Sequence, residues 1–131
     1  MASEKSGFGL SQIGQIAVTV QDLDRAVRFY RDVLGMKFLF QAPPALAFFS
    51  AGDVRLMLNV PENKKFDHPA SIIYYKVSDV HEAHRILSER GVAFVGAPHV
   101  VHRTDAYELW MADFHDSENN VLVLMSEVAR A

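Results

Sequence analysis

Two stretches of this 131-residue chain follow the same residue pattern, 57 positions apart. Four residues between 20 and 28 recur between 77 and 85, as the pairs Val20/Val77, Asp22/Asp79, Ala26/Ala83 and Arg28/Arg85. After the loss of one residue, the agreement continues in Gly-Met-x-Phe (35–38) and Gly-Val-x-Phe (91–94), and later in Leu-Met-Leu (56–58) and Leu-Val-Leu (122–124). A unit whose capping, helical and closing residues recur in register predicts two modules of one fold.

The hydrophobic pattern of each half predicts the order strand, helix, strand, strand, strand. In the first half we expect strands at 13–20, 36–41, 45–50 and 54–60, a turn at Pro43-Pro44, and a helix that begins after Asp22 and ends at Gly35. In the second half we expect strands at 71–77, 92–95, 107–114 and 120–126, a helix capped by Ser78 or Asp79 and ended by Gly91, a polar connection at 100–105 and a turn at 115–119. Each half is therefore a βαβββ module.

The predicted fold class is α+β. One module cannot cover both faces of its own sheet, so two tandem modules should place their helices outside and form a curved mixed sheet around a central cleft. We expect a flexible N-terminal tail (1–11), a single domain (12–127) and a C-terminal tail (128–131). The domain divides into module one (12–60), a linker (61–69) and module two (70–127).

Charge and composition exclude several classes of function. The formal net charge is −3, with both signs interspersed, which disfavours a nucleic-acid or anionic-membrane partner. The chain has no cysteine, so it has no disulfide, no thiolate metal ligand and no cysteine nucleophile. No apolar run reaches the ~18 residues of a membrane span, and the first residues lack an apolar signal core, so we expect a cytoplasmic protein.

Three stretches, taken in order, carry a resemblance. They are IAVTVQDLDRAVRFY (16–30), VLGMKF (33–38) and the turn DSENN (116–120). Together they resemble the vicinal-oxygen-chelate family, which includes glyoxalases, bleomycin-resistance proteins and extradiol dioxygenases. The turn departs from the family's Asp-Pro-Asp-Gly-Asn pattern at Ser117 and Asn119. The resemblance covers residues 12–127 and implies the fold, but the fold hosts many different functions.

The resemblance also implies where a metal would be held. Many members of the family bind one divalent ion through His or Gln, Glu, His and Glu on the first and last strands of each module. The repeat places the corresponding positions at Gln15, Met57, Ile72 and Val123. Ile and Val have no donor atom, and a thioether is a poor ligand for zinc, nickel, magnesium or iron, so we expect no metal. A shifted strand would bring His68 nearer, although His68 is more simply interpreted as a linker residue.

Strand alternation predicts which side chains line the cleft. The resulting set is mixed in polarity, as small-molecule pockets are; the alternative is that these side chains fill the cleft themselves. Trp110, the only tryptophan, is added as a possible stacking surface for a planar ligand. The predicted ligand-binding residues are Gln15, Thr19, Arg55, Met57, Asn59, Ile72, Tyr74, Trp110, Val123 and Met125.

Three residues are candidates for acid–base chemistry: Glu108, His99 and His102. Alternation places Glu108 and Trp110 on one side of strand 107–114 and leaves open whether that side faces the cleft. The same question applies to Phe48 and Phe49. His81 and His84 have helical i, i+3 spacing, but their helix should lie outside the cleft.

Three functions remain in competition at this point. The first is a glyoxalase/bleomycin-resistance-like protein that binds a small aromatic or amphipathic molecule without the usual metal. The second is an enzyme, either a lactoylglutathione-lyase-like lyase or isomerase or a dioxygenase, with an atypical or metal-free site. A third possibility is an interaction module with a filled cleft. In each case the resemblance implies a homodimer.

Overall fold

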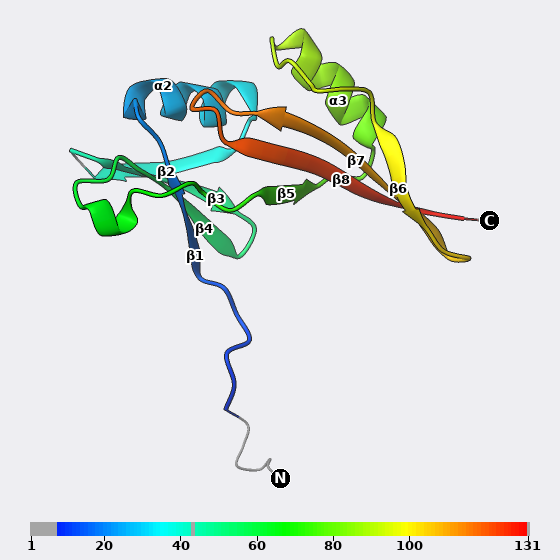
Figure 1. The fold of residues 1–131 in the computed structure, drawn as a ribbon, viewed down its shortest axis with the longest axis horizontal. Helices are drawn as coiled ribbons and strands as arrows, with labels where there is room; N and C mark the ends of the chain where they lie inside the picture. Colours follow the sequence, from blue (N-terminus) through cyan, green and yellow to red (C-terminus); the bar gives the residue numbers. More distant parts are fainter. Residues whose placement is uncertain (1–7, 43, 131) are drawn as a thin grey trace.

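The computed structural model describes residues 8–42 and 44–130 and contains two four-stranded sheets with the same strand order (Figure 1). The first sheet has the order β1-β4-β3-β2, formed by β1 (Gln15–Thr19), β2 (Lys37–Ala42), β3 (Leu46–Ala51) and β4 (Val54–Asn59). The second has the order β5-β8-β7-β6, formed by β5 (Ile73–Lys76), β6 (His99–Arg103), β7 (Tyr107–His115) and β8 (Val121–Ala129). In both sheets the first strand pairs in parallel with the last, and the other pairs are antiparallel. The predicted α+β fold of two βαβββ modules is confirmed.

Each helix begins at the aspartate that the repeat singles out. The first runs through α2 (Leu23–Arg28) and a π-helical turn η1 (Phe29–Val33), and the Asp22 side chain accepts a hydrogen bond from the Arg25 N–H at 3.1 Å. The second, α3 (Val80–Glu89), is capped by Asp79 rather than Ser78. Gly35 (φ 71°) and Gly91 (φ 95°) adopt the left-handed conformation that ends a helix and favours glycine.

The core lies between the sheets and the helices. Both helices lie on the same side of the sheets (Figure 1), and the strand residues that face them are the most buried in the chain. This layer is built from apolar strand residues and from the helix residues that pack on them. The strands contribute Val18, Phe49, Leu56, Leu58, Ala112, Phe114, Leu122 and Leu124, and the helices contribute Leu23, Ala26, Tyr30, Val80 and Leu87. The alternation predicted for the first and last strand of each module, β1, β4, β5 and β8, was therefore correct.

Two predictions about module two were wrong. Residues 92–95 are not a strand, because only Phe94 forms an isolated bridge, to Phe114. Residues 100–105 are not a polar connection, because β6 (His99–Arg103) pairs along β7. The edge of β7 needs an antiparallel partner for its backbone groups, and the two valines of His99–Arg103 suit a strand. The linker also contains a short 3-10 helix, η2 (Lys64–Phe66). Residues 1–7 of the expected tail, Pro43 of the expected turn and residue 131 lie outside the described residues.

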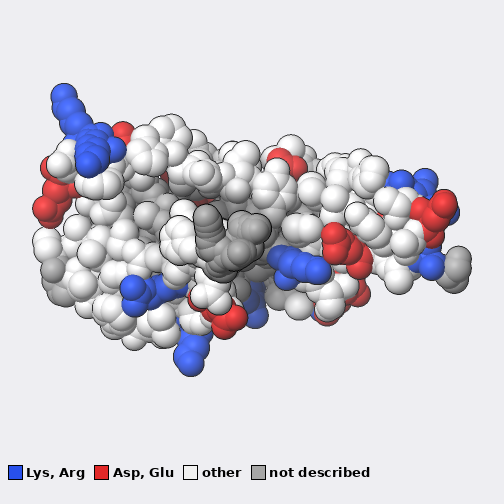
Figure 2. Space-filling view, turned by 90° about the horizontal axis from the view of Figure 1, so that it is seen from below, with Lys and Arg blue, Asp and Glu red and all other residues white. Residues whose placement is uncertain are grey.

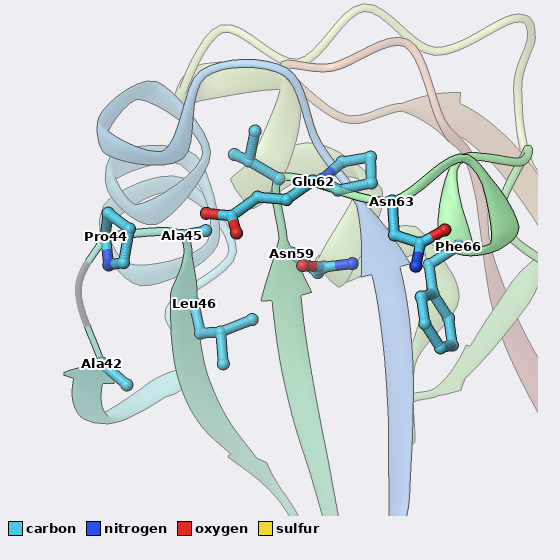
Figure 3. A pocket seen from close by; sticks show the side chains of 10 residues that line it. Ala42, Pro44, Ala45, Leu46, Asn59, Glu62, Asn63 and Phe66 are labelled. Carbon is cyan, nitrogen blue, oxygen red and sulfur yellow. The ribbon is translucent and has the colours of Figure 1, made fainter.

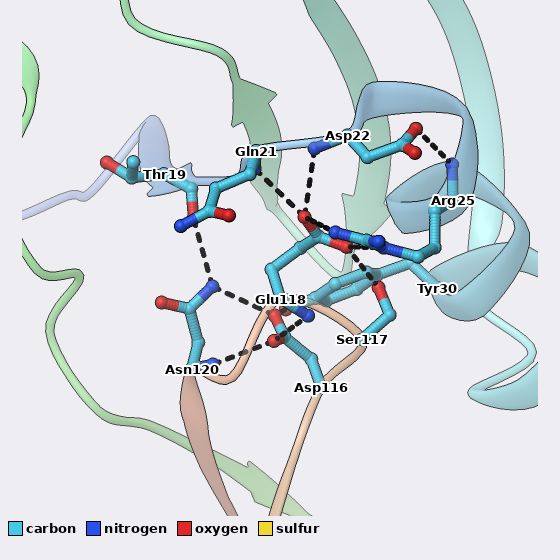
Figure 4. A network of polar contacts seen from close by, with 9 residues as sticks. All are labelled: Thr19, Gln21, Asp22, Arg25, Tyr30, Asp116, Ser117, Glu118 and Asn120. Atoms are coloured by element: carbon cyan, nitrogen blue, oxygen red, sulfur yellow. Dashed lines mark hydrogen bonds and ion pairs between the residues drawn. The ribbon is translucent and has the colours of Figure 1, made fainter.

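A buried carboxylate, Asp116, joins the two modules (Figure 4). It lies in the turn between β7 and β8, and its Oδ2 accepts a 2.6 Å hydrogen bond from the Tyr30 hydroxyl of the first helix. Its Oδ1 accepts from the backbone N–H groups of Glu118 and Asn120, both at 2.8 Å, which shapes the turn. Asn119 is left-handed (φ 67°), a conformation that asparagine tolerates better than most residues. The turn of module two is therefore built around a contact with module one.

Glu118 forms the second contact between the modules. Its carboxylate accepts from the backbone N–H groups of Gln21 and Asp22, both at 2.9 Å, and pairs with Arg25 at 2.7 Å (Figure 4). Burial by itself raises the pKa of Glu118, but Arg25, the two backbone N–H groups and the Ser117 hydroxyl together lower the pKa to about 2. The Arg90 guanidinium adds a third contact by donating to the Val33 carbonyl at 2.9 Å.

The lowered pKa of Glu118 predicts an acid-dependent loss of stability. The contribution of Glu118 is complete above its ordinary pKa of 4.5 and is lost as the pH falls from there to about 2, because over this range the unfolded chain binds a proton that folding has to release. We expect Glu118→Gln to reduce the pH dependence of the free energy of unfolding over this range, measured by urea denaturation. The matched control is Glu62→Gln, at an exposed linker position. A pH profile of Glu118→Gln identical to that of the parent would contradict the prediction.

Candidate functional site

The faces of the two sheets that point away from the helices are here called the open faces. On the first sheet, the open face carries the predicted cleft residues of β1 and β4 and, by register, residues of β2 and β3. Its members are Gln15, Ala17, Thr19, Lys37, Phe40, Ala42, Leu46, Phe48, Ser50, Arg55, Met57 and Asn59. Alternation therefore located this face, although it did not include the residues of β2.

Three of the predicted site residues contact one another on the first open face. The Arg55 Nε donates to the Gln15 Oε1 at 2.8 Å, and the Gln15 Nε2 lies 3.6 Å from the Met57 sulfur. Because β1 and β4 are adjacent and parallel, Gln15 lies directly opposite Arg55. The two other predicted residues of this sheet, Thr19 and Asn59, also face each other in register at the far end.

An aromatic pair lies beside this cluster. The Phe48 ring stacks on the Phe40 ring with centroids 4.5 Å apart, and the Arg55 guanidinium carbon lies 5.2 Å from the Phe48 centroid. Phe40 is 47% exposed, so one aromatic surface remains available to a ligand. The open question of the two adjacent phenylalanines is thus settled: Phe48 belongs to the open face, and Phe49 is fully buried beneath the first helix.

The open face of the second sheet combines apolar and titratable side chains. Tyr74 pairs with Val123, and Met125 lies opposite Met111. Ile72 precedes β5 and is 50% exposed, while Tyr74 is 49% exposed. Of the predicted residues in this module, Tyr74, Val123 and Met125 share a face, and Ile72 lies immediately before β5.

Several titratable residues lie on this second open face, among them Lys76 and Glu127, which form an ion pair at 3.3 Å. His99 pairs with Met111 and His102 with Leu109, so both imidazoles lie on the open side of β6. Asp113 lies opposite Val123 and was missed by sequence reasoning. The register of β7 against β8 would have identified it, but that register follows from the fold rather than from the local pattern.

Glu108 and Trp110 lie on the other side of β7, the side that meets α3, which answers the question that alternation left open and places Trp110 away from the open face. Trp110 pairs with the fully buried Ser126, and its ring meets that of His81 on α3 at 4.7 Å. The Glu108 carboxylate pairs with Arg103 at 2.7 Å, which lowers its pKa. A base that is held by arginine on the helix side does not serve a ligand on the open face.

A hollow of about 310 Å³ lies where the first open face ends (Figure 3). Asn59 and Leu46 form its floor from β4 and β3, and Glu62, Asn63 and Phe66 of the linker form its wall. A second, more apolar hollow of about 470 Å³ lies on the helix side, between Leu34–Met36 and α3. Of the predicted ligand-binding residues, only Asn59 lines either hollow.

Among the residues that the structure describes, none encloses either open face. Both lie on the side opposite the helices, and a view from below shows a surface dominated by uncharged residues (Figure 2). The exposed apolar side chains there include Phe40, Ile72 and Tyr74. Within the described ranges, the place of the expected central cleft is thus taken by two open sheet faces.

This architecture is that of a known protein family. A sequence model of the Glyoxalase/Bleomycin resistance protein/Dioxygenase superfamily matches residues 12–124. The chain belongs to this superfamily. No curated protein sequence matches the chain significantly.

Several solved structures share the fold at low sequence identity. Lactoylglutathione lyase from Agrobacterium tumefaciens superposes with a TM-score of 0.75 at 22% identity, covering 90% of this chain and 95% of that one. TnmS3, an antibiotic binding protein from Streptomyces sp. CB03234, gives 0.72 at 24% identity, covering 92% and 98%. A superfamily member from Sphaerobacter thermophilus gives 0.73 at 20% identity, covering 90% and 98%.

The donor atoms present do not fit the superfamily's metal. Of the four equivalent positions, only Gln15 offers an oxygen, and that oxygen already accepts from the cationic Arg55 guanidinium at 2.8 Å. A fixed positive charge at this point repels a second cation. Among residues 8–42 and 44–130, no group of three His, Asp or Glu side chains is arranged to hold a metal. His68 lies in the linker, where its Nδ1 is 3.0 Å from the carbonyl oxygen of Pro69.

Within the described part of the chain, no helix combines the length and apolarity that crossing a membrane requires.

Proposed function

We propose that this protein binds a small planar or amphipathic molecule on its open faces without using a metal. The observation that carries the proposal is the Arg55–Gln15–Met57 cluster, because it replaces the metal ligands of module one with a cation held beside an aromatic pair. A guanidinium, an amide and stacked rings are binding groups, and none of them is a nucleophile or a base at neutral pH. The fold shared with TnmS3, which is described as an antibiotic binding protein, is consistent with such a role.

A second copy of the chain is part of the proposal. Phe40 on the first open face and Ile72 and Tyr74 on the second are each about half exposed, and large apolar side chains exposed on both sheets are what an interface or a binding groove would cover. A twofold dimer that sets one module of each copy against the other module of its partner would turn two open faces into a closed cleft. We expect light scattering after size exclusion to give twice the mass of the chain.

The test of the function is a ligand screen that does not rely on Trp110 fluorescence, since that ring lies under α3. We expect planar aromatic compounds to raise the melting temperature and to form complexes visible by native mass spectrometry. Phe40→Ala should weaken binding of those compounds by roughly fivefold, because stacking on one aromatic ring contributes on the order of 1 kcal/mol. Phe8→Ala, at an exposed phenylalanine before β1, is the matched control. Absence of any complex across a broad aromatic panel would end the proposal.

The competing function is a metal-free enzyme of the same superfamily. His99, His102 and Asp113 favour it, because they present proton donors and acceptors on the second open face. Turnover of a bound compound that is abolished by His102→Asn or Asp113→Asn, with binding retained, would decide for this alternative. Elemental analysis of untagged protein separates it from a metal-dependent enzyme.

A further inference from the structure

We infer that the molecule bound on the first open face is an aromatic anion, whose carboxylate pairs with Arg55 and whose ring lies on the Phe40/Phe48 pair. The inference rests on the proposed function and specifies the chemical class of its ligand. It depends on how Arg55 is held, on which of its atoms remain available, and on the charge around it.

Among the described residues, the groups that hold Arg55 in place are neutral. Its Nε donates to the Gln15 Oε1 at 2.8 Å, and Gln15 is in turn held against the Met57 sulfur. The guanidinium carbon lies over the Phe48 ring, 5.2 Å from its centroid, a contact that favours arginine over lysine. The side chain is therefore ordered before a ligand arrives, which lowers the entropy cost of binding.

The charge of Arg55 is not neutralised within the described residues. Arg25, Arg31, Arg85 and Arg103 each pair with a carboxylate at 2.6–2.8 Å, whereas no ion pair among residues 8–42 and 44–130 includes Arg55. Both terminal nitrogens, Nη1 and Nη2, also lack an acceptor there, although Nε is satisfied. Two parallel N–H groups on a planar fork match the two oxygens of a carboxylate.

The surroundings of Arg55 favour an aromatic anion over other anions. The half-exposed Phe40 ring is stacked on the buried Phe48 ring, at an angle of 26° between the ring planes, and Phe48 in turn lies against the guanidinium, so an aromatic surface continues from Arg55 across the two neighbouring strands. Inorganic phosphate would use the charge but not this surface. The nearest carboxylate along the chain, Asp53, lies in the hairpin turn at the rim of a shallow hollow beside Arg55.

The experiment compares three probes of nearly equal shape by isothermal titration calorimetry: naphthoate, naphthamide and naphthylmethylammonium. We expect naphthoate to bind at least about tenfold tighter than naphthamide, and the ammonium to bind most weakly. Arg55→Gln should remove the preference for naphthoate while changing the affinity for naphthamide less than about threefold, and Arg55→Lys should retain part of the preference. Arg28→Gln, at an exposed cation on the first helix, is the matched control, and circular dichroism verifies that each variant is folded.

The outcomes distinguish this inference from the function on which it rests. If no naphthyl probe binds but other aromatic compounds do, or if naphthamide binds as tightly as naphthoate, the anion preference is wrong and the proposed function stands. If no aromatic compound binds, both fail. If Arg55 pairs instead with a carboxylate of a second copy, Arg55→Gln will weaken the dimer and leave the order of the three probes unchanged, which also overturns the inference.

Discussion

Replacing Asp116 with alanine is expected to lower the free energy of unfolding by about 3–5 kcal/mol, a large part of the ~5–15 kcal/mol of a domain this size. The carboxylate accepts four hydrogen bonds: two from backbone N–H groups of its own turn, one from the Asn120 side chain and one from the Tyr30 hydroxyl. Alanine leaves these donors without an acceptor, and the Tyr30 hydroxyl is fully buried. Burial and Asp116 together raise the pKa of Tyr30, so the hydroxyl keeps its proton and must donate it.

Urea denaturation of Asp116→Ala beside Asp105→Ala measures this effect. Asp105 is exposed in the loop between β6 and β7, and its replacement should change stability by less than about 0.5 kcal/mol. Tyr30→Phe should cost about 1–3 kcal/mol, because Asp116 then keeps its other three donors. A double-mutant cycle of the two changes should show strong coupling between the modules. If Asp116→Ala is no less stable than Asp105→Ala, the turn does not hold the modules together as described.

Phe49→Ala is expected to cost about 3–5 kcal/mol of folding stability. The Phe49 ring is fully buried, and its centroid lies 5.5 Å from that of Phe38 and 6.0 Å from that of Tyr30. Removing it leaves a cavity under the first helix that the surrounding side chains fill only in part. Phe40, on the opposite side of the same sheet, is half exposed and should cost far less when it is replaced.

Chemical denaturation of Phe49→Ala, Phe40→Ala and Phe8→Ala compares one residue type in three environments. We expect the loss to follow burial, with Phe49 far above Phe40 and Phe8 near zero. Phe40→Ala should nevertheless affect ligand binding, which Phe49→Ala affects only through instability. Equal losses for Phe49 and Phe40 would mean that the assignment of the two faces of β3 and β2 is wrong.

The helix ends of both modules could be predicted from local signals. Asp22, Asp79, Gly35 and Gly91 mark helix ends by side-chain chemistry and backbone freedom that act within a few residues, so the pattern is legible in the chain. Alternation in β1 and β4 worked because one face of each strand is strongly apolar and the other mixed.

The same reasoning failed where both faces of a strand carry apolar residues. In β7, Leu109 and Met111 alternate with Trp110 and Ala112, so period alone does not say which side meets the helix. Pairing with β8 decides it, since Trp110 meets the buried Ser126 and Met111 meets Met125. β6 was missed for a related reason: its hydrogen bonds depend on a partner strand that a local window does not contain.

The amino-acid order of this chain, by itself, determined the duplicated module, the ends of its helices and the fact that three of the four equivalent strand positions carry no oxygen or nitrogen donor, because each depends on nearby residues or on residue type. Tertiary structure alone decided which side of β7 meets α3, that Arg55, Gln15 and Met57 form one cluster, and that Asp116 and Glu118 join the modules. These contacts span 40 or more positions in the chain. Contacts between positions so far apart arise only when strand pairing and helix packing bring them together.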